Sequence, residues 1–355
     1  MINLLDRMGV QQTVVVPRSG LKDPSWDLRG NQIKVLEIPR NDYCFGYLGL
    51  IRQDVFFHEV PELDQTWDLI HIQAINFAPL AYVSSNGTIP ILYSVYSFLR
   101  QELGDSNEPE LQAQFKIQEE LLMRSQCIHL VSKSEMSYLA KRFPEYLFKT
   151  EVLSLGISMP SERWHPGNTI ELLYVGRLLN YKGIEDLIKA VSFVRKRGRN
   201  VRLNIVGKGA ESYEDNLKRL VRTAKLDNSV KFHGWKSPSE VRKWMAGASC
   251  LVVPSHREAF GLVALEGMIM GTPVIASNAG GLLEIASNNC ALTFEAGNFL
   301  KLSHAIVTLH DNPYLQMALS QNGRQKALKH DWNHLGSSYM MLLERTKSVR
   351  EYSVR

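Results

Sequence analysis

Residues 250–276 read CLVVPSHREAFGLVALEGMIMGTPVIA, and this stretch decides the fold class. A short apolar run, Cys250–Val253, ends at a proline, and an apolar helical stretch begins near Phe260–Gly261. A second short run with strand character follows at Pro273–Ile275. Strand, loop, helix and strand in this order make a βαβ unit, which joins two parallel strands. The stretch therefore predicts an α/β protein.

The same alternation of short apolar runs and helical patterns continues through the chain, and it is typical of parallel sheets built from βαβ units. Six strands with intervening helices make the second half one complete doubly wound domain. The predicted strands of that half are Glu171–Val175, Arg202–Val206, Val230–Phe232, Cys250–Val253, Pro273–Ile275 and Ala291–Thr293, and those of the first half are Thr13–Val16, Ile33–Glu37, Leu69–Ile72, Ile89–Tyr93 and Ile128–Val131.

A polar, aperiodic stretch bracketed by prolines, residues 158–167, predicts the linker between two domains. We expect a Rossmann-like domain over residues 1–157 and a second over 158–330, facing each other across a cleft. The apolar spacing of 332–347 predicts a C-terminal helix, over 331–355, that returns to the first domain. A Rossmann domain normally opens with a strand and a glycine-rich turn, whereas residues 1–7 predict a helix end, so the opening βα unit is expected to be missing.

The composition is that of a soluble globular protein, with 45% hydrophobic and 22% charged residues in a chain of 355. The net charge of +5 is mild, and the densest basic cluster, Arg195–Arg199, is expected at a helix end, where cations complement the helix dipole. No aromatic residues interleave with that cluster, which speaks against nucleic-acid binding.

The cysteines and the apolar runs bear on location. The four cysteines, Cys44, Cys127, Cys250 and Cys290, are far apart, which indicates neither a zinc site nor a disulfide framework and favours the cytoplasm. The sequence holds no uncharged apolar run of about 18 residues, so we expect no membrane span, while a peripheral contact at the inner membrane face stays open.

The first candidate site follows the strand Glu171–Val175. Gly176 permits a tight turn, and Arg177 and Lys182 are two cations five positions apart on one loop. At the carboxyl end of a parallel strand such cations can converge on a diphosphate and stabilise it as a leaving group without a metal. The alternative is a surface loop with two solvated cations.

The next two strands also end in glycine turns. Gly207 and Gly209 follow Arg202–Val206 and would admit a nucleotide close to the backbone, although many α/β turns need glycine only for their geometry. Gly234 and Trp235 follow Val230–Phe232. Trp235 would flank a base or, as an alternative, pack at the strand end.

The stretch 250–276 carries the most specific pattern. The helix that begins near Phe260–Gly261 directs free backbone N–H groups into the crevice, which makes its end an anion site. Glu258 precedes this helix and is placed to reach sugar hydroxyls, and Glu266 lies eight positions later within an apolar run. Two solvated glutamates are the alternative, which the apolar surroundings of Glu266 disfavour.

These motifs together resemble the retaining glycosyltransferases of family 4, which have the GT-B fold. The resemblance rests on Gly176–Arg177 with Lys182–Gly183, the Gly207-x-Gly209 turn, Gly234, and the pattern Glu258-x7-Glu266 followed by Gly271–Val274, and it covers the second domain. It implies that Arg177 and Lys182 bind the donor diphosphate, that Glu258 binds the transferred sugar and Glu266 the ribose, and that the amides of Phe260, Gly261, Leu262 and Val263 bind sugar and phosphates. It implies no metal and no cofactor. A UDP-sugar is the expected donor, with GDP-mannose as the second choice.

The first domain matches the family less well. Residues 67–71 and 91–96 stand where the family has an Asp-x-x-His-x-His and a Thr-x-His pattern. His71 is retained, but the later histidines are replaced by Gln73 and Tyr96. We assign His71 and Tyr96 to the acceptor side, where a tyrosine can still donate a hydrogen bond or pack as an aromatic.

Several functions are compatible with these patterns. The favoured one is transfer of a hexose or N-acetylhexosamine from a nucleotide-sugar to a hydroxyl of a glycan, a lipid-linked or a small-molecule acceptor, in bacterial polysaccharide or glycoside synthesis. The alternative from another class is a catalytically silent nucleotide-sugar-binding or scaffolding protein. Epimerases and phosphorylases share the architecture, but the two-glutamate pattern speaks against the first, and no lysine in a pyridoxal setting supports the second.

Overall fold

The chain is described by a computed structural model, which places residues 1–17, 32–38, 67–85, 87–165 and 170–353. Cys44 and the predicted linker positions Pro166 and Gly167 lie outside the described residues. Two compact units emerge, Met1–Ser154 with Trp332–Arg355, and Leu155–Asp331. The division falls between residues 154 and 155, whereas the sequence predicts it between 157 and 158.

The second unit contains a six-stranded sheet in which every neighbouring pair is parallel. Its order is β12-β11-β10-β7-β8-β9, so the strands run outward in both directions from the central pair β7 and β10. This is the doubly wound order that the sequence predicts. The strands are β7 Ile170–Val175, β8 Val201–Val206, β9 Val230–Phe232, β10 Cys250–Val253, β11 Val274–Ser277 and β12 Leu292–Phe294.

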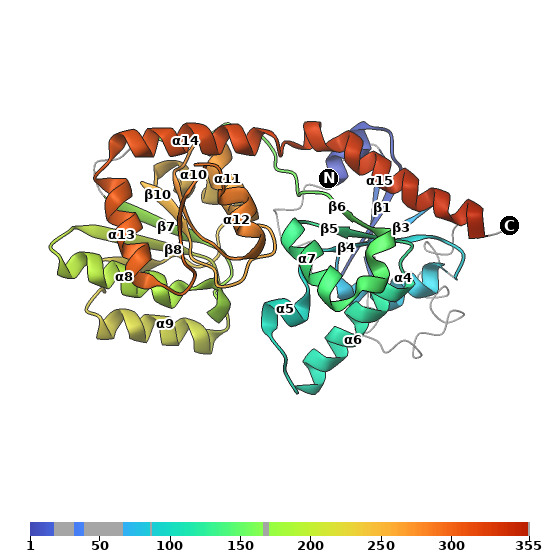
Figure 1. The fold of residues 1–355 in the computed structure, drawn as a ribbon, viewed down its shortest axis with the longest axis horizontal. Helices are drawn as coiled ribbons and strands as arrows, with labels where there is room; N and C mark the ends of the chain where they lie inside the picture. The colour runs from blue at the N-terminus through green and yellow to red at the C-terminus, as the bar shows by residue number, and fades with distance from the viewer. Residues whose placement is uncertain (18–31, 39–66, 86, 166–169, 354–355) are drawn as a thin grey trace. The chain divides into compact units, whose positions relative to one another are not determined.

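Helices cover both faces of this sheet (Figure 1). Helix α8 buries one stripe of apolar residues, among them Ile184, Leu187, Ile188 and Val191, because helical positions three and four apart share a face. That stripe packs with α9 and α13 in the main core of the unit. The helices are α8 Ile184–Lys196, α9 Glu211–Thr223, α10 Pro238–Gly247, α11 Leu262–Met270, α12 Gly280–Ala286, α13 Phe299–His310 and α14 Pro313–Leu328.

The first unit holds two parallel sheets among its described residues, β1-β2 and β3-β4-β5-β6. The predicted strands of this half are all found, while β6 was not predicted, because three residues of sequence Thr-Glu-Val carry little apolar signal. The strands are β1 Gln12–Pro17, β2 Ile33–Ile38, β3 Ile70–Ile72, β4 Ile91–Val95, β5 Cys127–Leu130 and β6 Thr150–Val152, and the helices are α1 Ile2–Arg7, α4 Ala78–Ser85, α5 Leu99–Leu103, α6 Pro109–Arg124, α7 Lys133–Arg142 and α15 Trp332–Ser353.

The long helix α15 packs on the first unit. Leu342 of α15 is buried with Leu92 of β4 and Cys127 of β5, and Gly336 faces Leu4 of α1 at close range. The opposite face of the sheet buries Tyr93, Val95 and their neighbours. Both faces of β4 are therefore covered, which matches its uniformly buried pattern.

The predicted linker is partly anchored. Trp164 is 8% exposed, its indole N–H donates to the carbonyl of Ala248 at 2.8 Å, and its backbone N–H donates to Met270 at 3.0 Å. Ile157 forms a parallel bridge with Asp331. Part of the stretch that the sequence marks as polar and aperiodic is thus packed on the second unit.

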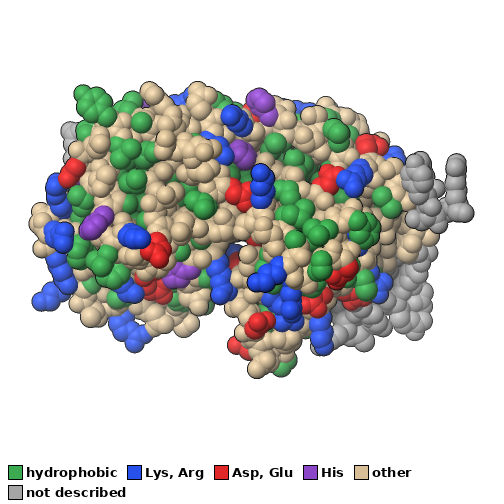
Figure 2. Space-filling view, viewed as in Figure 1, with side chains coloured by type: hydrophobic (Ala, Val, Ile, Leu, Met, Phe, Trp, Pro, Cys, Tyr) green, Lys and Arg blue, Asp and Glu red, His purple; other side chains and the backbone are tan. Residues whose placement is uncertain are grey.

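Charges of both signs are interspersed over the described residues on the face drawn in Figure 2. No helix of the described residues is long and apolar enough to cross a membrane. Within the same residues, no group of three or more His, Cys, Asp or Glu side chains is arranged to hold a metal ion.

Candidate functional site

The predicted donor residues follow the central strands of the second unit. β7 and β10 are neighbours, and the strand order reverses between them. Ligands of open α/β sheets bind outside the carboxyl ends of the strands at such a reversal. The loops that leave this point, 176–183 after β7 and 254–261 after β10, carry Arg177, Lys182 and Glu258.

The loops after β7, β8 and β9 are hydrogen-bonded to one another. The N–H of Gly176 donates to Val206 at 3.0 Å, that of Leu178 to Lys208 at 2.9 Å, and that of Gly207 to Gly234 at 2.8 Å. Gly207 has a φ of 145°, and a Cβ on it would lie 1.8 Å from the carbonyl oxygen of Gly176. Only glycine permits this approach, so its role is at least geometric.

The loops after β7 and β10 also touch through their backbones. Gly183 has a φ of 69°, and a Cβ on it would lie 2.0 Å from the carbonyl oxygen of Pro254. The N–H of His256 donates to the carbonyl of Tyr181 at 2.7 Å. The two loops therefore form one rigid surface at the switch point, and side chains from each meet there.

Lys182 and Glu258 form an ion pair across these loops. Lys182 Nζ lies 3.0 Å from Glu258 Oε2, with side chains 17% and 19% exposed. The hydroxyl of Ser255 donates to the same carboxylate oxygen at 3.2 Å. Glu258 and Lys182 therefore pair in a setting that screens their attraction less than an open surface does.

Arg177 reaches the same cluster through Tyr181. The guanidinium Nη2 donates to Tyr181 Oη at 3.4 Å, and Lys182 Nζ lies 5.3 Å from the centre of the Tyr181 ring. The ring of Tyr181 is buried, so both cations lie against one fixed aromatic group. The structure thus brings Arg177, Lys182 and Glu258 into one neighbourhood.

Helix α11 begins beside Glu258. Gly261 is its N-cap, no side chain caps it, and the first turn contains no acidic residue. The amides of Leu262 and Val263 are in the first turn, where the helix itself offers no acceptor, and they carry the positive end of the helix dipole. The carbonyl of Glu258 is fixed by the N–H of Gly281 in α12 at 2.9 Å.

Glu266 lies one turn further along α11, and its side chain is half-buried. Burial raises the pKa of its carboxyl to about 7, and the positive charge of Arg242 opposes that rise. Ionising a carboxyl in such a place costs free energy, so a glutamate here lowers the stability of the folded protein. The half-buried side chain agrees with the apolar surroundings that the sequence gives Glu266.

Gly234 and Trp235 follow β9. Gly234 accepts from the N–H of Gly207, so it belongs to the connected loops. Trp235 is 49% exposed, so the packed-tryptophan alternative is wrong. A half-exposed indole beside the carboxyl ends of the strands leaves a ring face to stack on a planar ligand.

The two residues that the sequence analysis assigns to the acceptor side lie on the first unit, His71 within β3 and Tyr96 directly after β4. The phenol of Tyr96 donates to Gln73 Oε1 at 2.9 Å, so the two positions that depart from the family pattern contact each other. Tyr96 is 37% exposed. Burial raises the pKa of Tyr96 to about 12, so the phenol stays protonated, and able to donate, well above neutral pH.

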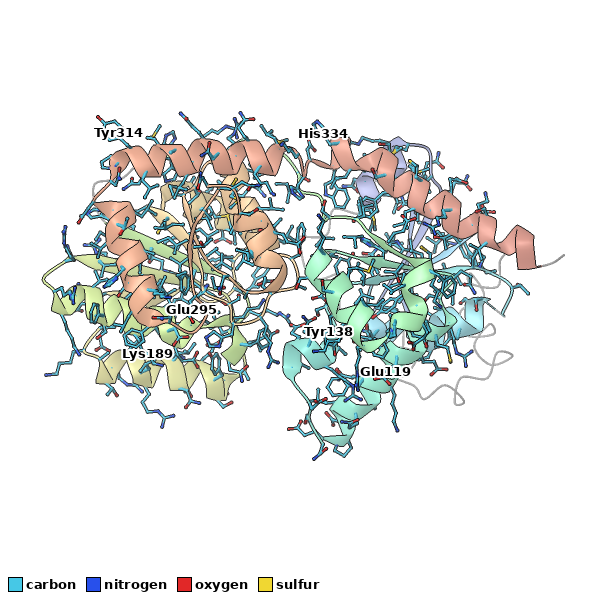
Figure 3. The ribbon with its side chains drawn as sticks, viewed as in Figure 1. Glu119, Tyr138, Lys189, Glu295, Tyr314 and His334 are labelled. Atoms are coloured by element: carbon cyan, nitrogen blue, oxygen red, sulfur yellow. The ribbon has the colours of Figure 1, made fainter. Side chains whose placement is uncertain are left out.

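Three residues near the switch point were missed by sequence reasoning. Tyr181 and Ser255 contact the predicted cations and glutamate, and His256 Nε2 lies 2.6 Å from Asp186 Oδ2 in the first turn of α8. Asp186 also pairs with Lys189, which Figure 3 labels, at 3.4 Å. Their only sequence signal was proximity to Lys182 and Glu258.

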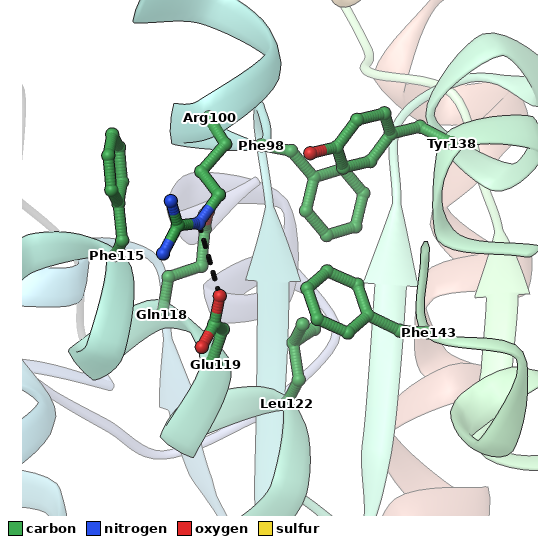
Figure 4. Close-up of a pocket in the computed structure, with 8 residues that line it drawn as sticks. All are labelled: Phe98, Arg100, Phe115, Gln118, Glu119, Leu122, Tyr138 and Phe143. Carbon is green, nitrogen blue, oxygen red and sulfur yellow. Dashed lines mark hydrogen bonds and ion pairs between the residues drawn. The ribbon is translucent and has the colours of Figure 1, made fainter. Parts of the chain in front are cut away.

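A small pocket in the first unit is a different feature (Figure 4). Arg100 lies over the ring of Phe115 at 4.4 Å and pairs with Glu119 at 3.2 Å. Phe98 and Leu122 are nearly fully buried, and the space has room for about one water molecule. It is a packing gap in an aromatic core and holds no substrate-sized ligand.

Comparison with known proteins finds a family and individual proteins that are similar to part of this chain. Residues 160–326 match the family model described as glycosyl transferases group 1. A D-inositol 3-phosphate glycosyltransferase of Pseudarthrobacter chlorophenolicus is 33% identical over 171 residues, which cover 47% of this chain and 40% of that protein. The matched part of the chain thus spans about two fifths of that relative.

Two solved structures resemble the whole chain. Sucrose-phosphate synthase of Thermosynechococcus elongatus superposes with a TM-score of 0.79 at 21% identity, covering 97% of this chain and 92% of that one. HepE of Anabaena, in complex with UDP and glucose, gives 0.75 at 18% identity, covering 97% and 94%. The chain has the GT-B fold, and the predicted fold class is confirmed.

Proposed function

We propose that the chain is a retaining glycosyltransferase that moves a hexose or N-acetylhexosamine from a nucleotide-sugar, a UDP-sugar first and GDP-mannose second, to a hydroxyl of an acceptor. The observation that carries the proposal is the cluster at the switch point of the second unit. Lys182, Arg177 and the start of α11 gather there around Glu258. The family match of residues 160–326 supports the same reaction class.

The cluster suits a diphosphate leaving group. Negative charge grows on the diphosphate as its bond to the sugar breaks, and a lysine, an arginine and free helix amides stabilise it best at that stage. In the structure Lys182 is neutralised by Glu258, 3.0 Å away. When the diphosphate of the donor binds Lys182, the Glu258 carboxylate is free to accept hydrogen bonds from the sugar hydroxyls. One ion pair would then be replaced by two contacts with the substrate.

The remaining contacts with the donor are assigned from the positions of the residues in the second unit. Glu266, a turn deeper on α11, accepts from the ribose diol, and the exposed ring of Trp235 flanks the base beside Gly207 and Gly234. HepE is similar in fold and was solved with UDP and glucose, which supports UDP as the first probe. Residues 155–331 are the donor unit in this proposal, and residues 1–154 with the C-terminal helix take the acceptor.

One experiment tests the reaction class. The full chain is incubated with a UDP-sugar labelled in the sugar and with a panel of glycan, lipid-linked and small-molecule acceptors, and the products are separated and their anomeric configuration is read by NMR. We expect transfer to a hydroxyl with the donor's configuration retained. Lys182→Ala should lower transfer about 100- to 1,000-fold, and the exposed Lys301→Ala serves as the matched control.

Other outcomes overturn the proposal in distinct ways. An inverted product rejects retention, and conversion of the donor without transfer to a second molecule indicates an epimerase. Tight donor binding without transfer or hydrolysis across the acceptor panel favours a silent binding protein, the alternative that the substitutions at Gln73 and Tyr96 raise.

A further inference from the structure

Polar side chains of the first unit cross three neighbouring strands in one hydrogen-bonded line. His71 Nε2 on β3 lies 2.7 Å from Ser94 Oγ on β4, and Ser94 Oγ lies 2.8 Å from His129 Nδ1 on β5. His129 Nε2 then reaches the backbone carbonyl of Leu153, after β6, at 2.6 Å. Ser94 and His129 are 2% and 1% exposed. A buried line of this length requires that each atom have a defined role.

The direction of every hydrogen bond in the line follows from its last member. A carbonyl oxygen only accepts, so His129 Nε2 carries the proton and donates to Leu153. In a neutral imidazole the other nitrogen then accepts, so His129 Nδ1 takes the hydroxyl proton of Ser94. Ser94 Oγ in turn accepts from His71 Nε2–H. His71 is left with a lone pair on Nδ1.

Both imidazoles are neutral at physiological pH. Burial lowers the pKa of His71 to about 3, with a smaller contribution from His129. Burial also lowers the pKa of His129, and its hydrogen bond to Leu153 opposes the shift. The ring of Tyr339 on α15 meets His129 edge-on at 5.5 Å, which covers the line from the helix side with an uncharged group.

The line ends near the edge of the sheet. His71 is half-buried at the second residue of the three-residue strand β3. Directly after these two strands, Gln73 and Tyr96 pair through a hydrogen bond of 2.9 Å. The His71–Ser94 hydrogen bond is thus inside the sheet, and the Gln73–Tyr96 hydrogen bond joins two exposed side chains beyond the carboxyl ends of the strands.

We propose that Ser94 and His129 are positioning residues that hold His71 as the Nε2–H tautomer, so that its Nδ1 accepts a hydrogen bond from an acceptor hydroxyl. The inference rests on the proposed function, because it assigns the acceptor to the first unit. An imidazole so weakly basic orients the hydroxyl proton and does not remove it. The proton therefore leaves with the diphosphate oxygen, and the first unit contributes orientation.

The tautomer of His71 is measured directly by NMR on the full chain labelled with 15N-histidine. The chain has ten histidines, and the His71 signals are assigned by their loss in His71→Gln. We expect a protonated Nε2 and an unprotonated Nδ1 that stay unchanged from pH 8 to pH 6. A protonated Nδ1, or an equal mixture of tautomers, in the wild-type protein overturns the inference without any variant having to fold.

The role of Ser94 is tested by Ser94→Ala, with Ser94→Thr as the conservative variant that keeps the hydroxyl. Ser94→Ala should mix the tautomers of His71 and lower kcat/KM for the acceptor about three- to tenfold, and leave KM for the donor unchanged. Ser94→Thr should restore both readouts. Ser125→Ala, which removes another buried hydroxyl of the same unit at 2.6 Å from Leu121 O, is the matched control and should change neither.

The two proposals fail separately. The expected tautomer without any sugar transfer overturns the proposed function and retains the hydrogen-bonded line. Sugar transfer by a protein in which Ser94→Ala leaves both the tautomer and the acceptor kinetics unchanged overturns the positioning role alone.

Discussion

The candidate sites of the two units consist of different kinds of groups, charged in the second unit and neutral in the first. In the second unit, charged groups and a helix start meet on loops whose backbones touch, as Lys182 and Glu258 do beside α11. In the first unit, neutral groups meet across strands, as in the line from His71 to His129. Charges suit the anionic diphosphate, and neutral hydrogen bonds suit a hydroxyl, so the contrast itself predicts which substrate each unit takes.

The largest expected effect on activity is that of losing a cation from the second unit. Lys182→Ala should lower kcat/KM for the donor about 100- to 1,000-fold, or roughly 2.7–4 kcal/mol, because one stabilising donor of the leaving group is lost. Lys196→Ala is the control, since Lys196 is exposed at the C-terminal end of α8, the end away from the loop that carries Lys182. Steady-state kinetics of both variants decide it, and a Lys182→Ala enzyme within tenfold of wild type contradicts the contrast.

The backbone contact between loops is tested by a pair of glycine variants. Gly183→Ala adds a Cβ 2.0 Å from the carbonyl oxygen of Pro254, whereas Gly198→Ala, at a φ of 81°, has nothing within 4 Å. Gly198→Ala should cost about 1–2 kcal/mol of unfolding free energy from the left-handed backbone alone. Gly183→Ala should cost more than about 4 kcal/mol, the range of exceptional substitutions. Urea unfolding measures both, and equal losses would show that the loops are not locked.

Glu266→Gln should separate stability from function. The pKa of Glu266 is raised to about 7 from 4.5, so the unfolded chain releases this proton at a lower pH than the folded protein. Wild type therefore loses stability as pH rises from 4.5 to 7, and the variant lacks this loss. We expect Glu266→Gln to be more stable than wild type at pH 8 by about 1–3 kcal/mol. Donor binding should weaken nonetheless.

The check is thermal unfolding across the pH range 4.5 to 8. The stability difference between Glu266→Gln and wild type should grow up to about pH 7 and then level off. A difference that does not vary with pH would mean that the Glu266 carboxyl is not destabilised in the folded protein.

The smallest expected effect concerns the exposed pair Gln73 and Tyr96 of the first unit. Tyr96→Phe, Gln73→Ala and the double variant form a cycle around the 2.9 Å hydrogen bond, for which we expect a coupling of about 0.5–1.5 kcal/mol in kcat/KM for the acceptor. Because the pKa of Tyr96 is raised to about 12, wild-type acceptor kinetics should show no tyrosine titration up to pH 10. If the effects of the two single variants on kcat/KM simply add, the two side chains do not act together at the acceptor site.

The difference between the units also explains what the sequence could predict. The βαβ pattern and the loops at residues 176–183 and 254–261 are local in the chain, so strand ends, glycines and cations were visible within about ten residues of one another. The cluster around Glu258 was predicted because each member follows directly from a strand end. Tyr181 was missed because an aromatic residue in a loop carries no signal of the cations that it contacts.

The polar line of the first unit was beyond sequence reasoning for a physical reason. Ser94 and His129 are 35 residues apart, and they meet only because β4 and β5 pair in a particular register. A serine or histidine inside an apolar strand gives no hint of its partner across the sheet. The pairing of Gln73 with Tyr96 is of the same kind, and only their departure from the family pattern drew attention to them.

Binding of UDP to the full chain is the most direct test of the anion cluster in the second unit. Isothermal titration calorimetry of wild type, Arg177→Ala and Lys182→Ala, with Lys196→Ala as control, measures the Kd without requiring an acceptor. We expect UDP to bind wild type and the control alike, and to bind each of the other two at least about tenfold more weakly, or 1.4 kcal/mol. Equal UDP affinity in all four proteins would contradict the assignment of Arg177 and Lys182 to the diphosphate.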